Sequence, residues 1–147
     1  DPMLRKRSKT VVDFNAKLWE LLDDMAETMH KANGVGLAAV QVGILRRVVV
    51  IDVGEGLIEL VNPEIVSKKG EIIDLEVCLS YPGEYGRVPR PEKVTVEAQD
   101  RNGKVFKIKG EGLLARAFCH EIDHLDGKVF KDLAIEMVDI TEEKGDQ

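Results

Sequence analysis

Two histidines four residues apart, with a glutamate directly after the first, mark the segment of this sequence that could do chemistry. His120, Glu121 and His124 fit the pattern His-Glu-x-x-His and use two of the three histidines in the chain. On an α-helix, residues four apart lie on one face with Cβ atoms about 5–6 Å from each other, so both imidazoles could bind one ion. The glutamate beside them could act as a general base toward water. The pattern predicts a metal-dependent hydrolase, and the alternative is an accidental match on a helix surface, because the motif is short.

A catalytic metal ion usually has three protein ligands and one open position, so a third ligand must lie elsewhere. The downstream candidates are the carboxylates of Glu136, Glu142 and Glu143. Upstream, Cys78 could complete a Cys-His-His site, although a buried apolar thiol is the more common situation for a cysteine. Cys119 precedes His120 directly and therefore points about 100° away around the helix, so we expect it in the core.

Length and composition indicate one globular domain. The chain has 147 residues, of which 44% are hydrophobic and 33% charged, and a chain of about this size buries roughly two-thirds of its unfolded surface. The net charge of −6 argues against direct binding to nucleic acids or membrane surfaces, which requires a basic surface. No apolar run approaches the ~20 residues of a membrane span, so we expect a cytoplasmic location, or an organelle matrix. Because the sequence starts at Asp1 and not at a methionine, the native N-terminus can lie further upstream.

Two helices are predicted to frame the chain. From Asp13 to about Ala32, apolar residues recur at spacings of three and four, which is the helical period. Thr10 or Asp13 is expected to cap this helix, and Asn33-Gly34 to end it, because glycine adopts the left-handed conformation readily. The second helix, from about Gly112 to Leu125, carries the histidine motif.

Strands are predicted between the two helices, without regular alternation of strand and helix. This arrangement favours an α+β fold in which antiparallel strands pack around the helix that carries the histidine motif. The expected strands are Arg47–Val53, Leu57–Asn62, Glu64–Ser67 and Glu71–Asp74, followed by a hairpin of Lys93–Gln99 and Lys104–Lys109. The intervening segment Tyr81–Pro91 is rich in glycine, proline and arginine and is expected to be irregular.

Two further segments make the sequence recognisable. Gly34–Gly43 reads G-V-G-L-A-A-V-Q-V-G, which alone indicates only a tight turn with close backbone approach. Glu76–Ser80 reads E-V-C-L-S and contains the upstream cysteine. Taken with the histidine motif, in this order and at this spacing, the two segments closely resemble the three motifs of peptide deformylase. The resemblance covers nearly the whole chain.

This resemblance implies a single catalytic domain over residues 1–147 that binds one divalent metal ion through Cys78, His120 and His124. The ion is expected to be Fe²⁺ natively, with Ni²⁺, Co²⁺ or Zn²⁺ as replacements, since a thiolate with two imidazoles suits several of these ions. The implied reaction uses metal-activated water to remove the formyl group from the N-terminal formylmethionine of new polypeptides, with release of formate. The partners would be N-formylmethionyl nascent peptides, met transiently near the ribosome exit.

The resemblance also implies roles for further residues. Glu121 would take a proton from the attacking water and deliver it to the departing amine. The side-chain amide of Gln41 and the backbone N–H of Leu79 would donate hydrogen bonds to the negatively charged oxygen of the tetrahedral intermediate. Gly36 and Val35 are expected to hold the substrate, and a glycine permits a close approach to its backbone.

The chain departs from the family pattern at two positions. Val77 stands where the second motif commonly has glycine, and it adds a branched side chain next to Cys78. Cys119 stands where glutamine is common before the first histidine, and it introduces a thiol that can be oxidised.

Several charged or terminal residues are given no catalytic role. Arg87, Arg90 and Tyr85 could steer a peptide or pair with Glu76, or they could form a charged surface loop. Residues 141–147 are expected to be a frayed, solvated tail. Two other functions remain open from the sequence alone, namely a metalloprotease that cuts internal peptide bonds and a structural metal-binding module in which both cysteines and both histidines are ligands.

Overall fold

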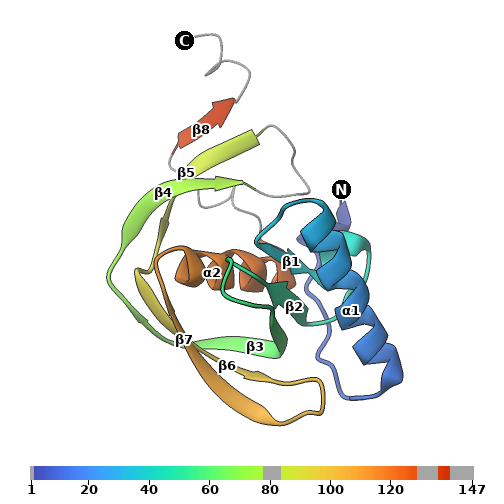
Figure 1. The fold of residues 1–147 in the computed structure, drawn as a ribbon. Coiled ribbons are helices and arrows are strands. Elements are labelled where there is room, and N and C mark those ends of the chain that lie inside the picture. The colour runs from blue at the N-terminus through green and yellow to red at the C-terminus, as the bar shows by residue number, and fades with distance from the viewer. Residues whose placement is uncertain (1, 78–83, 129–135, 140–147) are drawn as a thin grey trace.

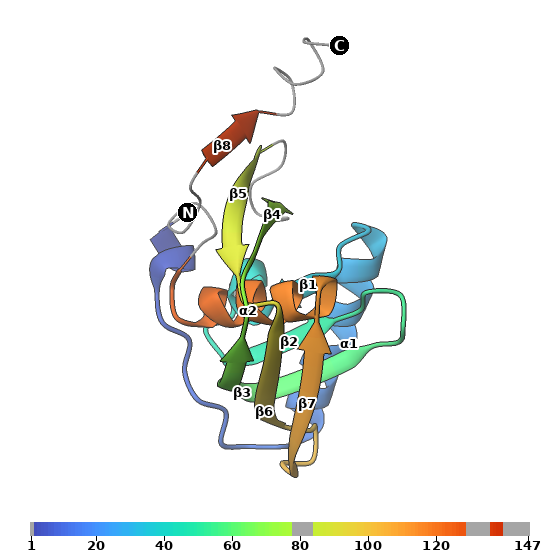
Figure 2. The same ribbon diagram turned by 90° about the vertical axis from the view of Figure 1, so that its left-hand side faces the viewer.

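The computed structural model describes residues 2–77, 84–128 and 136–139, and there two antiparallel sheets enclose a central helix. This helix, α2, spans Leu113–Leu125, and a second helix, α1, spans Ala16–Lys31. Strands β4 and β5 pass on one side of α2, whereas β3, β6 and β7 pass on the other (Figures 1 and 2). The predicted α+β fold, with antiparallel strands around the helix of the histidine motif, is confirmed.

The two sheets differ in size. The larger has the order β1-β2-β3-β6-β7, with β1 at Gly36–Ala38, β2 at Val48–Ile51, β3 at Ile58–Lys69, β6 at Lys93–Gln99 and β7 at Val105–Glu111. The smaller has the order β4-β5-β8, with β4 at Ile72–Val77, β5 at Glu84–Arg90 and β8 at Glu136–Asp139. Two short 3₁₀-helices, η1 at Pro2–Arg5 and η2 at Ala39–Val42, complete the described elements.

Strand β2 separates two hydrophobic cores because its side chains alternate between its faces. Val48 and Val50 belong to the core that contains the apolar face of α1, whereas Val49 and Ile51 belong to the core around α2. All four side chains are fully buried. A continuous apolar run is typical of a strand that is covered on both faces. This apolar run therefore indicates that β2 lies between the two helices, as Figure 1 shows.

The ends of α1 differ in detail from the prediction. The N-cap is Asn15, whose side-chain oxygen accepts a hydrogen bond from the N–H of Leu18, so the prediction of Thr10 or Asp13 as the cap was wrong. At the other end, the N–H of Asn33 donates to His30 O and the N–H of Gly34 to Met29 O, a Schellman motif. The left-handed residue is Asn33, with φ of 55°, and not the glycine after it. Asparagine tolerates this conformation better than most residues do.

A single strand, β3, replaces two of the predicted strands. The register between β3 and β6 shifts between Val61 and Glu64, and Asn62 in this bulge has φ of 50°. The side chain of Asn62 exchanges hydrogen bonds with the backbone of Val11 and donates another to Gln99. The gap that the sequence suggested between two strands is therefore a bulge that ties the N-terminal segment to the sheet.

The segment before Pro91 was predicted to be irregular, and this prediction was wrong for Glu84–Arg90. These residues form β5, which pairs with β4 over Ile72–Val77. Glycine, proline and arginine have low strand propensity, but pairing on both sides overrides propensity. Strand β5 also pairs with β8, so Glu136 lies in a strand and not in a frayed tail. Tyr81–Gly83 and the predicted tail at 141–147 lie outside the described residues.

The hairpin was predicted correctly. Strands β6 and β7 pair in continuous register from Lys93–Glu111 to Gln99–Val105. In the turn between them, the side chain of Asp100 accepts hydrogen bonds from the N–H groups of Asn102 and Lys104.

Among the described helices, none is both long enough and apolar enough to cross a membrane.

Candidate functional site

Helix α2 brings the three residues of the histidine motif together inside the protein. His120, Glu121 and His124 are 6%, 5% and 0% exposed, so neither histidine is an ordinary surface residue. The two imidazole rings lie edge to face with their centroids 5.0 Å apart. One ligand atom from each of the three residues lies within 4.8 Å of the others, so the group could hold one metal ion.

The electrostatics of this group suit a metal ion. Burial lowers the pKa of His124 to about 3, so its imidazole is neutral at pH 7 and keeps a lone pair for coordination. Burial raises the pKa of Glu121 to about 7. Its Oε1 is buried and has no hydrogen-bond partner among the described residues, whereas Oε2 lies 4.0 Å from Nε2 of His120. A buried carboxylate oxygen without a donor calls for a positively charged or protic group beside it.

A buried carboxylate on β4 fixes the orientation of His120. Nδ1 of His120 donates to Oε1 of Glu76 at 2.5 Å, so the ring presents Nε2 to the site. Burial alone would raise the pKa of Glu76, but the hydrogen bonds from His120 and Arg90 outweigh it and hold the pKa at about 2. Glu76 is therefore an anion at every pH at which the protein is expected to work.

Two buried arginines neutralise this carboxylate. Arg90 on β5 donates to both oxygens of Glu76, at 2.9 and 2.8 Å, and a further bond joins it to Asp123. Arg116 on α2 donates to Glu76 at 2.7 Å and to the carbonyl oxygens of Val88 and Ile72. The network ties β4 and β5 of the smaller sheet to the helix of the histidine motif.

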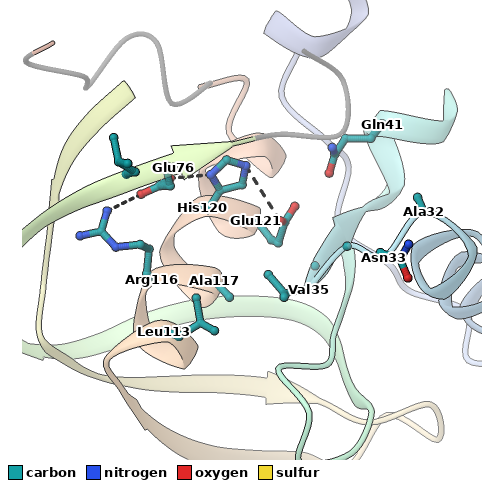
Figure 3. Close-up of a pocket in the computed structure, with 13 residues that line it drawn as sticks. Ala32, Asn33, Val35, Gln41, Glu76, Leu113, Arg116, Ala117, His120 and Glu121 are labelled. Atoms are coloured by element: carbon teal, nitrogen blue, oxygen red, sulfur yellow. Dashed lines mark hydrogen bonds and ion pairs between the residues drawn. The ribbon is translucent and has the colours of Figure 1, made fainter. Parts of the chain in front are cut away.

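A pocket of about 360 Å³ opens beside the histidine motif. Figure 3 shows Gln41 and Glu121 directed toward the same space from η2 and α2, with His120 behind them. Its lining is largely apolar and combines residues 32–36 with Leu75, Leu113 and Ala117. Such a pocket, with a few convergent polar groups at one end, suits a ligand with one apolar side chain and one polar reacting group.

The side chain of Gln41 is held in a defined orientation. Its Oε1 accepts a hydrogen bond from the backbone N–H of Ala38 at 2.9 Å. Because the amide oxygen is engaged by its own chain, the NH₂ group is the part of this side chain that is suited to donate to a ligand.

The predicted site residues fall into three groups. His120, His124, Glu121, Gln41, Gly36 and Val35 all line the pocket or belong to the buried group that could hold a metal ion. Cys119 lies in the core at 3% exposure, where burial raises the pKa of its thiol to about 11, and it is absent from that group. Cys78 and Leu79 lie outside the described residues, as does the side chain of Val77.

Of the charged residues near the second motif, Arg90 pairs with Glu76, which was one of the alternatives left open by the sequence, whereas Arg87 is exposed on β5. The side chain of Tyr85 is not among those described. Neither Glu76 nor Arg116 was predicted from the sequence as a site residue. A signal existed for both, because Glu76 begins the second motif and Arg116 stands four residues before His120, on the same face of the helix.

Comparisons with known proteins agree on one family. The family model described as polypeptide deformylase matches residues 1–139. A peptide deformylase of Caldicellulosiruptor bescii is 60% identical over 138 residues, which cover 94% of this chain and 83% of that protein. One from Caldanaerobacter subterraneus subsp. tengcongensis is 59% identical over 145 residues, which cover 99% of this chain and 91% of that protein.

Solved structures give the same result. The crystal structure of a peptide deformylase from Legionella pneumophila superimposes with a TM-score of 0.88 at 53% identity, covering 90% of this chain and 80% of that one. The family uses a divalent metal ion, with which the buried group on α2 is compatible. The chain belongs to the peptide deformylase family, the hydrolases that remove the N-formyl group from newly made polypeptides.

Proposed function

We propose that this deformylase performs its reaction at the polar end of the pocket, with His120, His124 and Cys78 as the ligands of one Fe²⁺ ion. The observation that carries the proposal is the buried group on α2, in which a neutral His124 and an oriented His120 face the same point beside a substrate-sized pocket. Cys78 comes two residues after Glu76 in the sequence, and Glu76 contacts His120. A divalent ion bound there supplies a Lewis acid, which lowers the pKa of water toward neutrality.

The chain's own residues carry the proton. Glu121 takes a proton from the attacking water as the water oxygen bonds to the formyl carbon. It then delivers this proton to the methionine nitrogen as the C–N bond breaks, so that formate and a free amine leave. Burial raises the pKa of Glu121 in the metal-free protein, and a carboxylate whose pKa lies closer to neutral is better suited to accept and then donate a proton.

Two donors are proposed for the negative charge that develops on the formyl oxygen. The NH₂ group of Gln41 is one, since Ala38 already engages the amide oxygen of that side chain. The backbone N–H of Leu79 is the other, assigned from the second motif alone. Loss of one such donor costs ~10²–10³ in turnover in enzymes that stabilise an oxyanion.

The pocket is proposed to take the methionine side chain. Leu75, Leu113 and Ala117 contribute apolar side chains to its lining, and Val35 and Gly36 line the same pocket. An unbranched thioether adapts to an irregular apolar cavity. N-formylmethionine begins new polypeptides, so we propose that the enzyme acts in the cytoplasm, in transient association with the ribosome exit and without direct nucleic-acid or membrane binding.

The test is formate release from formyl-Met-Ala-Ser by protein loaded with Fe²⁺ under anaerobic conditions, next to cleavage of an unformylated peptide. We expect formate and no internal cleavage. Cleavage of the unformylated peptide would support a metalloprotease, and tight metal binding without formate would support a structural metal module.

The role of Glu121 has its own test. Glu121→Ala is expected to keep the metal, measured by plasma emission, while turnover falls by about 10²–10⁴. Glu97→Gln, on an outward-facing position of β6, is the control and should change neither quantity. An unchanged rate in the Glu121 variant would refute the assigned proton transfer.

A further inference from the structure

We propose that Gly36 is a positioning residue for Glu121, in that its missing side chain leaves the space in which the carboxylate of Glu121 is held. The inference rests on the proposed proton transfer by Glu121. From the sequence, Gly36 was expected to bind the substrate through its backbone. The inference proposed here concerns instead the space between Gly36 and the Glu121 side chain on α2.

The contact between the two residues is very close. A Cβ atom added at Gly36 would lie 2.7 Å from Oε2 of Glu121, 2.9 Å from Cγ and 3.1 Å from Cδ. Carbon atoms in ordinary van der Waals contact are about 3.5–4.0 Å apart. A methyl group at this position therefore overlaps the whole outer half of the glutamate side chain, and not only its tip.

The overlap cannot be relieved by a small movement of the carboxylate end. Cγ is the first atom beyond Cβ, so relief requires rotation about χ1 or displacement of the backbone. Rotation is restricted, because Glu121 is only 5% exposed. A rotated carboxylate would leave its place beside His120, where Oε2 is 4.0 Å from Nε2.

The backbone of Gly36 is also held. It pairs with Ile51 in the register of β1 and β2, and the carbonyl oxygen of the preceding Val35 accepts a hydrogen bond from Asp52 at 2.8 Å. Gly36 is not among the glycines with positive φ. Alanine would therefore fit the backbone conformation here, and the side chain of Glu121 is what excludes it.

Replacement of Gly36 by alanine should therefore lower turnover and not substrate affinity. Gly36→Ala retains the backbone N–H and C=O through which a peptide could bind, but it displaces the group that transfers the proton. Misplacement of a catalytic group by about 1 Å can cost ~10²-fold in rate. We expect kcat to fall by about 10–100-fold with KM within about threefold of the wild type.

The experiment combines Gly36→Ala with Glu121→Ala in a double-mutant cycle on the metal-loaded enzyme. Glu121→Ala removes the three atoms that would lie nearest to the new Cβ. In that background, Gly36→Ala should lower the residual kcat by no more than about twofold. The melting temperature should follow the same pattern, with a loss of roughly 3–10 °C in the wild-type background that is largely restored in the double variant.

Gly110→Ala is the matched control. A Cβ there would lie 2.7 Å from Cε2 of Phe118, so it crowds the same helix to the same degree, but at a core side chain and not at Glu121. This variant should lower the melting temperature while the folded fraction keeps its kcat, and Glu121→Ala should not rescue it.

The outcomes distinguish a failure of the inference about Gly36 from a failure of the proposed role of Glu121. If Gly36→Ala lowers kcat equally in both backgrounds, or raises only KM, Gly36 acts on the substrate or on the fold directly and the inference is overturned. The inference also fails if the double variant melts as low as the Gly36 single variant. If Glu121→Ala itself leaves kcat unchanged, the proposed function of Glu121 fails, whatever the cycle of melting temperatures shows.

Discussion

Replacement of Glu76 by glutamine should destabilise the protein far more than the same replacement at the surface. Glutamine keeps the size of the side chain but removes the charge, and it turns an NH₂ group toward donors. Glu76 and Arg90 are each only 5% exposed at the side chain, and Arg116 is 9% exposed. Removal of one partner from a buried ion pair typically costs about 3–5 kcal/mol, because the other charge stays buried without compensation.

The pKa of Glu76 gives a similar magnitude. Its fall from an ordinary 4.5 to about 2 in the folded protein corresponds to about 3 kcal/mol, at about 1.4 kcal/mol for each pH unit. The folded-state pKa lies below the unfolded one, so this stabilisation is present above pH 4.5 and is lost as the pH falls toward about 2. Glu76→Gln should lack this part of the acid dependence.

Glu59 offers a matched control. It binds Arg101 through two hydrogen bonds of 3.0 and 2.6 Å, a geometry like that of Glu76 with Arg90. The side chain of Arg101 is 33% exposed, however, and that of Glu59 is 20% exposed. Exposed ion pairs contribute about 0.2–1 kcal/mol to stability. Glu59→Gln should therefore cost about 1 kcal/mol or less.

Urea unfolding of the metal-free protein, followed by the fluorescence of Trp19, measures both variants. Metal is removed because a bound ion would add its own pH-dependent stabilisation. The reasoning is refuted if Glu76→Gln costs no more than Glu59→Gln, or if the Glu76 variant keeps the full acid dependence of the wild type between pH 4.5 and 2.

Three further outcomes are expected. Gln41→Ala should lower turnover by about 10²–10³ with unchanged metal content, and a rate close to that of the wild type would contradict its role as a donor. Cys78→Ala should lose the metal, measured by plasma emission, whereas Cys119→Ala should keep it; the reverse result would show that the wrong thiol was chosen. Asn62→Ala should lower the free energy of unfolding by about 3 kcal/mol, from three hydrogen bonds at about 1 kcal/mol each, and a loss below about 1 kcal/mol would mean that the bulge does not depend on that side chain.

The elements with a strong local signal could be predicted from the sequence. The helical period located α1 to within a few residues, and the Asp100–Gly103 turn located the hairpin of β6 and β7. The cap of α1 was misplaced because Thr10, Asp13 and Asn15 all have side chains that can cap a helix, and only the chain path selects among them. Such choices depend on packing that local sequence does not encode.

Strand β5 and the Glu76 network were beyond local reasoning for a different reason. The strand is defined by its pairing with β4 and β8, and its own composition points away from a strand. The contacts of Glu76 join residues 14, 40 and 44 positions apart. Long-range polar contacts of this kind leave no periodic pattern in the sequence. The histidines could be found because a helix brings residues four apart together on its own.

The contacts that orient His120 have a consequence for how the enzyme acquires its metal. Glu76 bonds to the imidazole, and Arg90 and Arg116 bond to Glu76, so contacts between protein groups orient the ring. In zinc fingers, by contrast, metal binding drives folding, because the unfolded chain has no preformed metal site. In the proposed site, these contacts would orient the histidine part before an ion binds. We therefore expect that one ion can be exchanged for another in the folded enzyme, without unfolding of the chain.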